Sequence, residues 1–177
     1  MRVIVEDTNI IIDLFNTGLL SLCDGMGIEF HTTRYVIGEI REREQVQVLR
    51  GFVNNKKLLV DGFSGEEYEK LMEFIAECNG ENNLSEADCS VLLLAKRLKC
   101  RLLTSDRKLK RKAEEHGIEV NGFLWLTDLL VEEQIVTEKT MVKHLNRYLE
   151  TNPRAPENEV VKRIDFYNKK IIMNNKL

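Results

Sequence analysis

The fold is first indicated by Val3-Ile4-Val5-Glu6-Asp7, a short apolar stretch that runs into an acid. A second stretch, Arg101-Leu102-Leu103-Thr104-Ser105, runs into Asp106 in the same way, and helical sequence follows both acids. Short apolar runs of this kind are typical of buried parallel strands. Because ligands of open α/β sheets bind beyond the carboxyl ends of the strands, we expect Asp7 and Asp106 at the functional edge of one sheet.

Outward from these two strands, apolar and polar segments alternate as strands and helices do in a parallel sheet. Strands are expected at 2–6, about 28–31, 58–61, 101–105 and near 119–120. Helices are expected at about 9–23, 33–55, 65–78, 85–98, 107–116 and 123–133, with a turn at 80–83. Parallel strands need crossover helices, so this order predicts an α/β fold: a three-layer α/β/α sandwich with a central parallel sheet, plus C-terminal helices.

The composition changes beyond Val136, where two amphipathic helices are expected. One apolar stripe consists of Met141, Leu145, Tyr148 and Leu149, and the other of Val160, Ile164, Tyr167 and Ile171. Pro153 and Pro156 separate them. We therefore predict a main domain over 1–135 and a helical extension over 136–177. The two stripes either dock on the main domain or contact a partner or a second copy of the chain.

The composition and the cysteine spacing of the chain exclude several classes of protein. Its 177 residues, 43% of them hydrophobic, are enough for one domain with a proper core. No apolar run approaches the roughly 20 residues that span a bilayer, and a strand is expected at the start without a basic leader, so a cytoplasmic protein is expected. The cysteines form no Cys-x-x-Cys pair, which argues against a zinc ribbon or redox motif and favours buried thiols: Cys23, Cys78, Cys89 and Cys100.

Four acids are expected near one edge of the sheet, two after strands and two on helices: Asp7, Asp106, Glu39 and Asp88. Each has a structural explanation. The two aspartates after strands can cap the helices that follow, Asp88 stands three residues after Ser85 in a near capping box, and Glu39 can pair with Arg43 one turn on. Capping does not require that all four lie at the same edge, so their conjunction favours a shared site.

Carboxylates that share a site repel one another. Two like charges about 4 Å apart repel by about 4 kcal/mol at an effective dielectric constant near 20, which raises the pKa values of the acids. Mg²⁺ prefers oxygen ligands and is typically held by one or two carboxylates together with water and substrate phosphates. Such an ion activates water and stabilises the oxygens of an in-line phosphoryl displacement. The four acids therefore predict phosphodiester hydrolysis with a hard divalent cation such as Mg²⁺.

A run of basic residues surrounds Asp106. The nine bases between positions 96 and 112 are Lys96, Arg97, Lys99, Arg101, Arg107, Lys108, Lys110, Arg111 and Lys112. Phosphate contacts from such residues supply most of the nonspecific affinity for nucleic acids. A charged surface helix is the commoner explanation of such a run, so the run supports an RNA substrate only in combination with the acids.

Taken together, four segments resemble the motifs of PIN-domain nucleases, and especially of the VapC type of bacterial and archaeal toxin. They are Val5-Glu6-Asp7-Thr8-Asn9, Glu39, Leu84-Ser85-Glu86-Ala87-Asp88 and Leu102-Leu103-Thr104-Ser105-Asp106-Arg107-Lys108-Leu109. The resemblance covers roughly residues 1 to 135 and includes the order and spacing of the four acids. It implies a parallel-sheet α/β/α fold and a magnesium- or manganese-dependent endoribonuclease, the toxin of a type II toxin–antitoxin pair.

The resemblance also implies the residues of the site and the partners. Four side chains would be catalytic and metal-binding: Asp7, Glu39, Asp88 and Asp106. Asp7 and Asp88 would be the direct ligands, while Asn9 and Thr104 or Ser105 would orient water or a carboxylate. The expected partners are an RNA substrate, an antitoxin protein and a second copy of the chain in a homodimer. The extension after about Val136 departs from the common toxin pattern.

Other functions remain open at this point. A non-catalytic PIN-like or receiver-like module that binds RNA or protein would also place acids at strand ends, and Glu6-Asp7 could imitate the acid pair of a receiver. The receiver pattern does not explain Asp88 inside a helix. A haloacid-dehalogenase-like phosphatase would need an aspartate at the position of Asn9, and no Gly-x-x-x-x-Gly-Lys phosphate loop is present.

Overall fold

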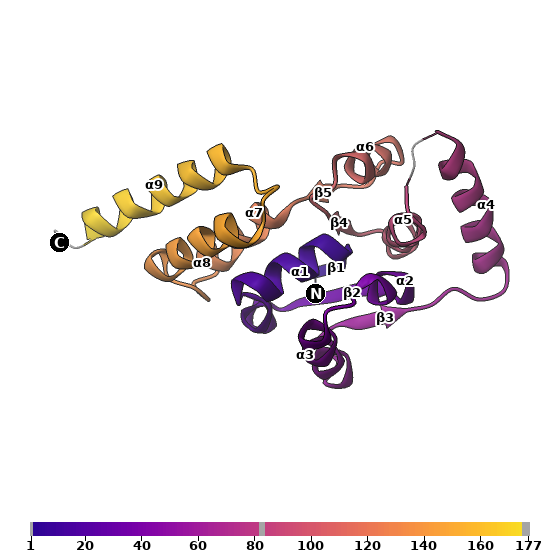
Figure 1. The fold of residues 1–177 in the computed structure, drawn as a ribbon, viewed down its shortest axis with the longest axis horizontal. Helices are drawn as coiled ribbons and strands as arrows, with labels where there is room; N and C mark the ends of the chain where they lie inside the picture. Colours follow the sequence, from indigo (N-terminus) through magenta and orange to yellow (C-terminus); the bar gives the residue numbers. More distant parts are fainter. Residues whose placement is uncertain (1, 82–83, 175–177) are drawn as a thin grey trace. The chain divides into compact units, whose positions relative to one another are not determined.

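A five-stranded sheet in which every neighbouring pair is parallel forms the centre of the computed structural model, which describes residues 2–81 and 84–174 (Figure 1). The strands are β1 (Arg2–Glu6), β2 (Ile28–Thr33), β3 (Leu59–Asp61), β4 (Arg101–Leu103) and β5 (Val120–Asn121), in the order β3-β2-β1-β4-β5. The predicted parallel α/β sheet is confirmed.

Helices fill the connections between successive strands. They are α1 (Thr8–Thr17), α2 (Arg34–Glu39), α3 (Arg43–Asn54), α4 (Glu66–Glu81), α5 (Glu86–Leu98) and α6 (Arg107–Glu115), with a 3-10 helix, η1 (Leu20–Met26). Parallel crossovers are almost always right-handed, and the chain moves from β1 towards β3 and then from β4 towards β5. Its connections therefore cover both faces of the sheet, and the strand order reverses between β1 and β4.

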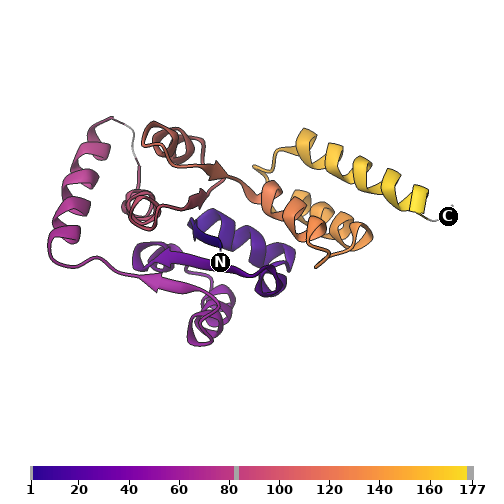
Figure 2. The same cartoon turned by 180° about the vertical axis from the view of Figure 1, so that it is seen from behind.

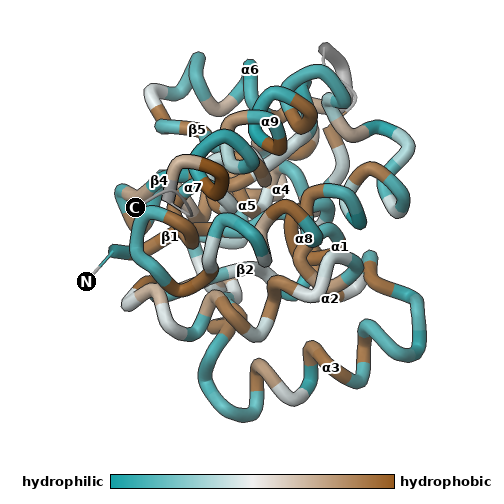
Figure 3. The backbone as a smooth tube through the Cα atoms, turned by 90° about the vertical axis from the view of Figure 1, so that its left-hand side faces the viewer, coloured by the Kyte–Doolittle hydropathy of each residue, from teal (hydrophilic) through white to brown (hydrophobic). Residues whose placement is uncertain are grey.

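The central strands are buried because helices cover both of their faces. Ile4, Val5, Leu102 and Leu103 are at most 1% exposed, and α5 packs across β1, β2 and β4. The α3 helix is amphipathic instead: hydrophobic and hydrophilic segments alternate along it (Figure 3), which is typical of a helix with one solvent-facing side.

The helix predicted over 9–23 is interrupted. Gly18 adopts a left-handed conformation with φ +79°, the amide of Leu19 donates to the carbonyl of Leu14, and the amide of Gly18 donates to that of Phe15. These bonds are those of a Schellman motif, which ends a helix at a glycine. Two further boundaries differ from the prediction. Strand β4 ends at Leu103, two residues earlier than expected. Helix α4 extends to Glu81, into the predicted turn, and residues 82–83 lie outside the described part.

By its contacts the chain divides into two compact units, Met1–Ile11 with Gly27–Gly122 and Ile12–Met26 with Phe123–Leu177. The first contains the sheet. The second contains α7 (Phe123–Glu132), α8 (Glu138–Thr151) and α9 (Glu157–Asn174). The functional boundary near residue 135 stays a prediction, since a division by compactness does not test it.

The second unit buries most of the first predicted apolar stripe and half of the second, while Leu149, Ile164 and Ile171 are half-buried. Met141, Leu145 and Tyr148 of α8 and Val160 of α9 are at most 1% exposed, and the two helices pack side by side (orange and yellow in Figure 2). Residues 12–26 take part in the same unit, since the His144 ring donates to the carbonyl of Thr17 over 2.7 Å. The predicted pair of C-terminal helices, separated by the segment with the prolines, is confirmed.

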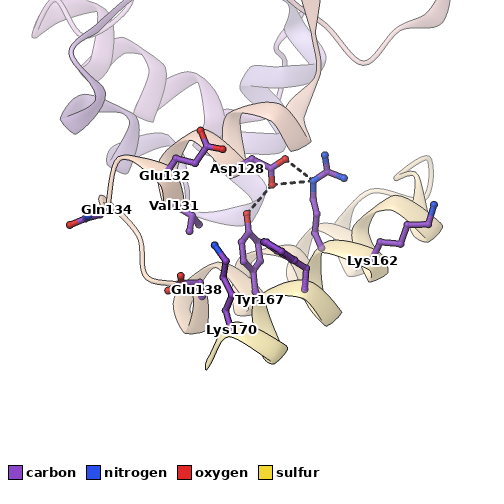
Figure 4. Close-up of a pocket in the computed structure, with 10 residues that line it drawn as sticks. Asp128, Val131, Glu132, Gln134, Glu138, Lys162, Tyr167 and Lys170 are labelled. Atoms are coloured by element: carbon purple, nitrogen blue, oxygen red, sulfur yellow. Dashed lines mark hydrogen bonds and ion pairs between the residues drawn. The ribbon is translucent and has the colours of Figure 1, made fainter. Parts of the chain in front are cut away.

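Asp128 of α7 anchors α9 within this unit (Figure 4). Arg163 Nε donates to Asp128 Oδ2 over 2.9 Å, and the Tyr167 hydroxyl donates to Asp128 Oδ1 over 2.8 Å. Phe166, beside them, remains 53% exposed. In the residues that the structure describes, no helix is both long and apolar enough to cross a membrane.

Candidate active site at the carboxyl edge of the sheet

The point at which the strand order reverses lies between β1 and β4, and two of the four predicted acids flank it. Asp7 directly follows β1, and Asp106, at the start of α6, comes three residues after the end of β4. Backbone hydrogen bonding continues past the strand end, since the Asp7 amide donates to the Leu103 carbonyl over 3.1 Å. In open α/β sheets such a reversal opens a crevice for ligands.

The carboxylate of Asp7 is buried and held by several donors. Only 3% of the residue is exposed. Its Oδ2 accepts from the Thr104 hydroxyl at 2.8 Å and from the Asn9 side-chain amide, and its Oδ1 accepts from the Thr8 backbone amide at 2.7 Å. The position of this carboxylate is therefore fixed by groups from both sides of the switch point.

Asn9 and Thr104 also fix the loop that follows β4. The Ser105 amide donates to Asn9 Oδ1 over 2.9 Å, and the Asp106 amide donates to the Thr104 hydroxyl over 3.0 Å. The start of α1 is thus tied to the turn before α6. Asn9 and Thr104 therefore contact both the Asp7 carboxylate and this loop, and their role in orienting a carboxylate for catalysis stays a prediction.

Glu39 reaches the same place from the end of α2. Its Oε2 accepts from the Thr8 hydroxyl over 2.6 Å, so in the described part of the chain its partner is Thr8 and not Arg43. Thr8 therefore bridges Asp7 and Glu39. Sequence reasoning missed this role; the only available signal was a hydroxyl immediately after the acid that ends the strand.

Asp88 lies in the first turn of α5 and serves as the predicted capping-box partner. The Ser85 amide donates to Asp88 Oδ2 over 2.8 Å, and the Asp88 amide donates to the Ser85 hydroxyl over 3.1 Å. Two residues on, the buried hydroxyls of Ser90 and Thr33 lie 2.7 Å apart and join α5 to the end of β2. That contact holds the start of α5 at the carboxyl edge.

Asp106 is the N-cap of α6, as its structural explanation predicts. Its Oδ1 accepts from the amides of Lys108 at 2.7 Å and Leu109 at 2.9 Å, and Oδ2 takes no part in this cap. Capping therefore does not prevent Asp106 from contributing charge to the site, since one carboxylate oxygen lies outside the cap.

Burial and neighbouring charge both act on Asp7. Desolvation is the largest cause that raises its pKa, to about 7, followed by the negative charge of Asp88, and Glu39 adds to the rise. The hydrogen bonds from Thr104 and Thr8 lower it and offset part of this effect. At neutral pH, Asp7 is therefore close to its titration midpoint, which is a mark of functional carboxylates.

The same forces raise the pKa of Asp88. Burial is again the largest cause, the bonds with Ser85 oppose it, and the charges of Asp106 and Glu39 raise it further. Each of the four predicted acids thus interacts electrostatically with at least one of the others. The structure brings them into one negatively charged region, although their hydrogen bonds are mostly to different protein donors.

Within residues 2–81 and 84–174, no three or more His, Cys, Asp or Glu side chains are arranged so that they could jointly hold a metal ion. A helix cap, a hydroxyl or a side-chain amide holds an oxygen of each of the four carboxylates. One or two carboxylates are enough for Mg²⁺ when water and phosphate oxygens complete the shell.

Glu6, beside Asp7, is a buried acid whose environment the sequence did not reveal. It is 2% exposed, and burial raises its pKa to about 8. It is therefore mostly protonated at neutral pH. Its position in an apolar strand was the one available signal, because a strand covered on both faces has no exposed side for a carboxylate.

The basic run is largely engaged by acids. Five of its nine members form ion pairs: Arg97, Arg101, Lys110, Arg111 and Lys112. Some of these pairs reach distant elements, as with Arg101 and Glu119 at 2.7 Å, and others lie within α6, as with Lys110 and Glu114 at 3.8 Å. A charged surface with its own counter-charges accounts for most of the run.

Comparison with known proteins agrees with this geometry. The model of the family described as DUF3368, PIN domain, matches residues 3–169. The chain belongs to the PIN domain family. The match extends through α8 and into α9, so it includes most of the residues that follow Val136.

Two relatives carry ribonuclease names. Ribonuclease VapC9 of Archaeoglobus fulgidus is 32% identical over 126 residues, which cover 70% of this chain and 84% of that protein. Endoribonuclease Nob1 of Pyrococcus abyssi is 30% identical over 95 residues, covering 54% of this chain; the match spans only 59% of the length of Nob1. A solved structure, the PilT N-terminus domain protein SSO1118 of Sulfolobus solfataricus P2, aligns with TM-score 0.42 and 14% identity, covering 75% of this chain and 93% of that one.

Proposed function

We propose that this protein is a metal-dependent endoribonuclease that hydrolyses RNA phosphodiester bonds at the carboxyl edge of its sheet. Membership of the PIN domain family and the two ribonuclease-named relatives support a nuclease. The single observation that carries the proposal is the electrostatic coupling of four carboxylates at the switch point of the sheet: Asp7, Glu39, Asp88 and Asp106.

The donor set suits a hard divalent cation. All four groups are carboxylates, and the strongest charge effects on the pKa values of Asp7 and Asp88 come from other carboxylates, so a cation would relieve the repulsion. Asp7 and Asp88 would bind Mg²⁺ or Mn²⁺ directly, with Glu39 and Asp106 close by. When bound, the cation supplies an activated water and charge stabilisation for the oxygens of the displaced phosphodiester.

The residues of the chain itself position and charge the site. Thr104 and Asn9 hold the Asp7 carboxylate in one orientation, and Thr8 restrains Glu39 in the same region. Preset orientation of this kind lowers the entropic cost of aligning a water with a phosphorus atom. Attack by water on the phosphodiester would leave 5′-phosphate and 3′-hydroxyl ends.

The direct test is cleavage of an end-labelled RNA by wild type in Mg²⁺, Mn²⁺ or chelator. Cleavage is expected only with a metal, and the products are expected to carry 5′-phosphates, which a 5′-phosphate-dependent exonuclease would then degrade. RNA that stays intact in both metals would instead support the second candidate, a non-catalytic RNA- or protein-binding module. The engagement of every acid by protein donors is the observation that favours this second candidate.

Metal is also expected to stabilise the fold. At a metal concentration about a hundred times the dissociation constant, binding to the folded state alone adds about 2.7 kcal/mol, which raises the melting temperature by roughly 5 to 10 °C. In chelator, Asp7→Asn should melt above wild type, because it removes a buried charge that repels Asp88 and Glu39. Calorimetry at pH 7 checks both. Melting curves indifferent to metal and to the substitution would mean that the acids are not crowded together.

We further propose that the protein is the toxin of a type II toxin–antitoxin pair, cytoplasmic and inhibited by an antitoxin, and that it forms a homodimer. The similarity to the relative named Ribonuclease VapC9 supports the toxin role. Induced expression should arrest growth, and co-expression of the product of a small adjacent reading frame should restore it. Unimpaired growth with active enzyme present would point to a housekeeping nuclease.

The RNA backbone requires a positively charged surface. Arg41, Arg43 and Arg50 line a hollow of about 540 Å³ on α3 and the segment before it, and in the described residues no acid lines this hollow. Arg41 follows Glu39 by two residues, so its Cα lies within about 7 Å of that of Glu39. An RNA strand that reaches the acids would thus pass close to these arginines.

Replacing all three arginines by alanine is expected to weaken RNA binding and to flatten its dependence on salt. Each lost phosphate contact lowers the slope of log K against log salt by about 0.7 for single strands, so three contacts lower it by about 2. The matched variant is Lys108→Ala, Lys110→Ala and Arg111→Ala, which tests the basic run. Fluorescence anisotropy across a salt series measures both. If the matched variant changes the slope of log K against log salt more, the phosphate contacts belong to α6 and not to the three arginines.

A further inference from the structure

A second hollow lies on the same edge of the sheet, beyond β2 and β3. It encloses about 610 Å³, and three of its lining side chains are aromatic: Tyr35, Phe63 and Tyr68. Arg34 and Ser64 add polar groups to its wall. Tyr68 is 47% exposed, although aromatic rings usually lose much more of their surface in a folded chain. Three rings around one open hollow form a surface that can accept a flat ligand.

The wall of this hollow is held in place before any ligand arrives. Arg97 of α5 donates to Asp61 over 2.7 Å, to the Gly62 carbonyl over 3.0 Å and to Glu67 over 2.9 Å. Its guanidinium also lies over the Phe63 ring, 5.2 Å from the centroid. Arg97 thus contacts the end of β3, two residues of the loop and the first turn of α4, and ring positions that are set beforehand lower the entropic cost of binding.

The hollow is close to the four acids. Tyr35 and Glu39 are both on α2, four residues apart, so their Cα atoms differ by about 6 Å along the helix axis. On its other side Tyr35 is near the start of α5, since Glu86 contributes to the rise of the Tyr35 pKa, after burial and Tyr68. Glu86 precedes Asp88 by two residues. Along the sheet, the hollow at β3 and β2 is therefore followed by the acids at β1 and β4.

We propose that this aromatic hollow binds one unpaired base of the RNA substrate, within about two nucleotides of the phosphodiester that is cleaved. The proposal rests on the proposed ribonuclease function and names its substrate class as single-stranded RNA. The limit follows from the roughly 6 Å between Tyr35 and Glu39 along α2 and a rise of about 3.4 Å per stacked nucleotide, since an unstacked strand spans more per nucleotide. Each base of a single strand offers a flat face that stacks on aromatic side chains.

The chemistry of the wall suits an unpaired base and the phosphate beside it. Bases within an A-form duplex are stacked on each other and unavailable, so a ring-lined hollow beside the acids selects loops and single strands. Arg34 can stack on a base or contact the adjacent phosphate. Both oxygens of Asp61 are already engaged, one by Arg97 and the other by the ring of His31 at 2.6 Å, so this carboxylate would not repel the phosphates as a free one would.

The first experiment measures binding without cleavage. In the Asp7→Asn background, Tyr35→Ala with Tyr68→Ala is compared with the matched pair Tyr35→Phe with Tyr68→Phe, using a fluorescent single-stranded RNA in chelator. The alanine pair should lose about tenfold to a hundredfold in affinity, as expected for one stacked base, whereas the phenylalanine pair should bind normally. Tyr68→Ala alone, at an exposed position, should melt like its parent and still lose affinity.

The second experiment locates the base. A single abasic position is moved along an RNA whose cleavage site is known, and only one position, within about two nucleotides of that site, should weaken binding. At that position the alanine pair should add no further loss, because both changes remove the same contact. Losses of RNA affinity that are equal at every abasic position, or that add to the loss in the alanine pair, would overturn the proposal of a base pocket.

The outcomes separate the two proposals. If wild type cleaves RNA and the alanine pair binds RNA as tightly as its Asp7→Asn parent, the base pocket is wrong and the nuclease stands. If wild type neither binds nor cleaves RNA, both proposals are wrong. Unchanged RNA affinity with a lost affinity for an antitoxin peptide would assign the hollow to a protein partner and would also overturn the base pocket.

Discussion

Asp7→Asn is expected to lower RNA cleavage by about a thousandfold or more while the protein stays folded. The substitution keeps the size of the side chain but removes a charge that a divalent cation would need, and such charge stabilisation contributes several kcal/mol, each 1.4 kcal/mol being tenfold in rate. The Asp7 side chain is also the most firmly held of the four, by Thr104, Asn9 and Thr8. Single-turnover cleavage in Mg²⁺ measures the loss.

Two further variants make this result specific. Thr104→Val leaves the charge of Asp7 but removes a donor to it, and is expected to cost about tenfold to a hundredfold, as loss of a group that orients a ligand does. Asp165→Asn, at an exposed acid of α9, should cleave like wild type. Full activity of purified Asp7→Asn would remove Asp7 from the proposed ligands.

Glu6→Gln is expected to make the protein more stable at and above neutral pH. The pKa of Glu6 is about 8 in the folded protein against 4.5 for an ordinary glutamate, because burial disfavours the charged form. The folded state therefore binds the proton more tightly than the unfolded chain. The contribution of Glu6 to the free energy of unfolding is therefore highest below pH 4.5 and falls as the pH rises from 4.5 to 8. At pH 7 the loss is on the order of 3 kcal/mol, which an uncharged glutamine avoids.

Chemical denaturation from pH 4 to pH 9 measures this effect. Asp13 and Asp7, whose pKa values burial raises to about 6 and about 7, act in the same direction, so the slope of wild type should be reduced in Glu6→Gln and not abolished. Glu114→Gln, at an exposed position on α6, is the matched control and should keep the slope of wild type. Parallel curves for wild type and Glu6→Gln would show that Glu6 does not stay protonated on folding.

Local patterns predicted the sheet well because its strands are short, apolar and separated by amphipathic helices. Val3-Ile4-Val5 and Leu102-Leu103 form β1 and β4 as expected, and five of the eight residues in the two C-terminal stripes are buried. The interruption at Gly18 was missed, since the hydrophobic pattern continues into Leu19, Leu20 and Cys23, which are buried beyond the end of α1. The left-handed conformation of one glycine ended the helix where periodicity alone could not.

The positions of the acids along the chain could be used to predict a site, but their hydrogen-bond partners could not be predicted. The position of an acid after a strand is a local property, so the edge of the sheet could be inferred for Asp7 and Asp106. The hydrogen bond from Thr8 to Glu39 joins residues 31 apart, and that from Ser105 to Asn9 joins residues 96 apart. Such partners depend on tertiary packing. The same limit applies to Arg97, which the sequence placed in an RNA-binding run and which clamps the β3–α4 loop instead.

The second compact unit is built from residues 12–26 and 123–177, so its two parts leave the ribosome at different times. Residues 27–122 are synthesised in between, which takes about 5 to 20 s at bacterial and eukaryotic elongation rates. During that interval Leu14, Leu19 and Leu20, all at most 7% exposed in the finished fold, lack the helices that complete their unit. The nascent chain therefore presents an apolar segment to chaperones and proteases until the later part of the unit, from residue 123 on, has been synthesised, and conditions that slow elongation would lengthen that exposure.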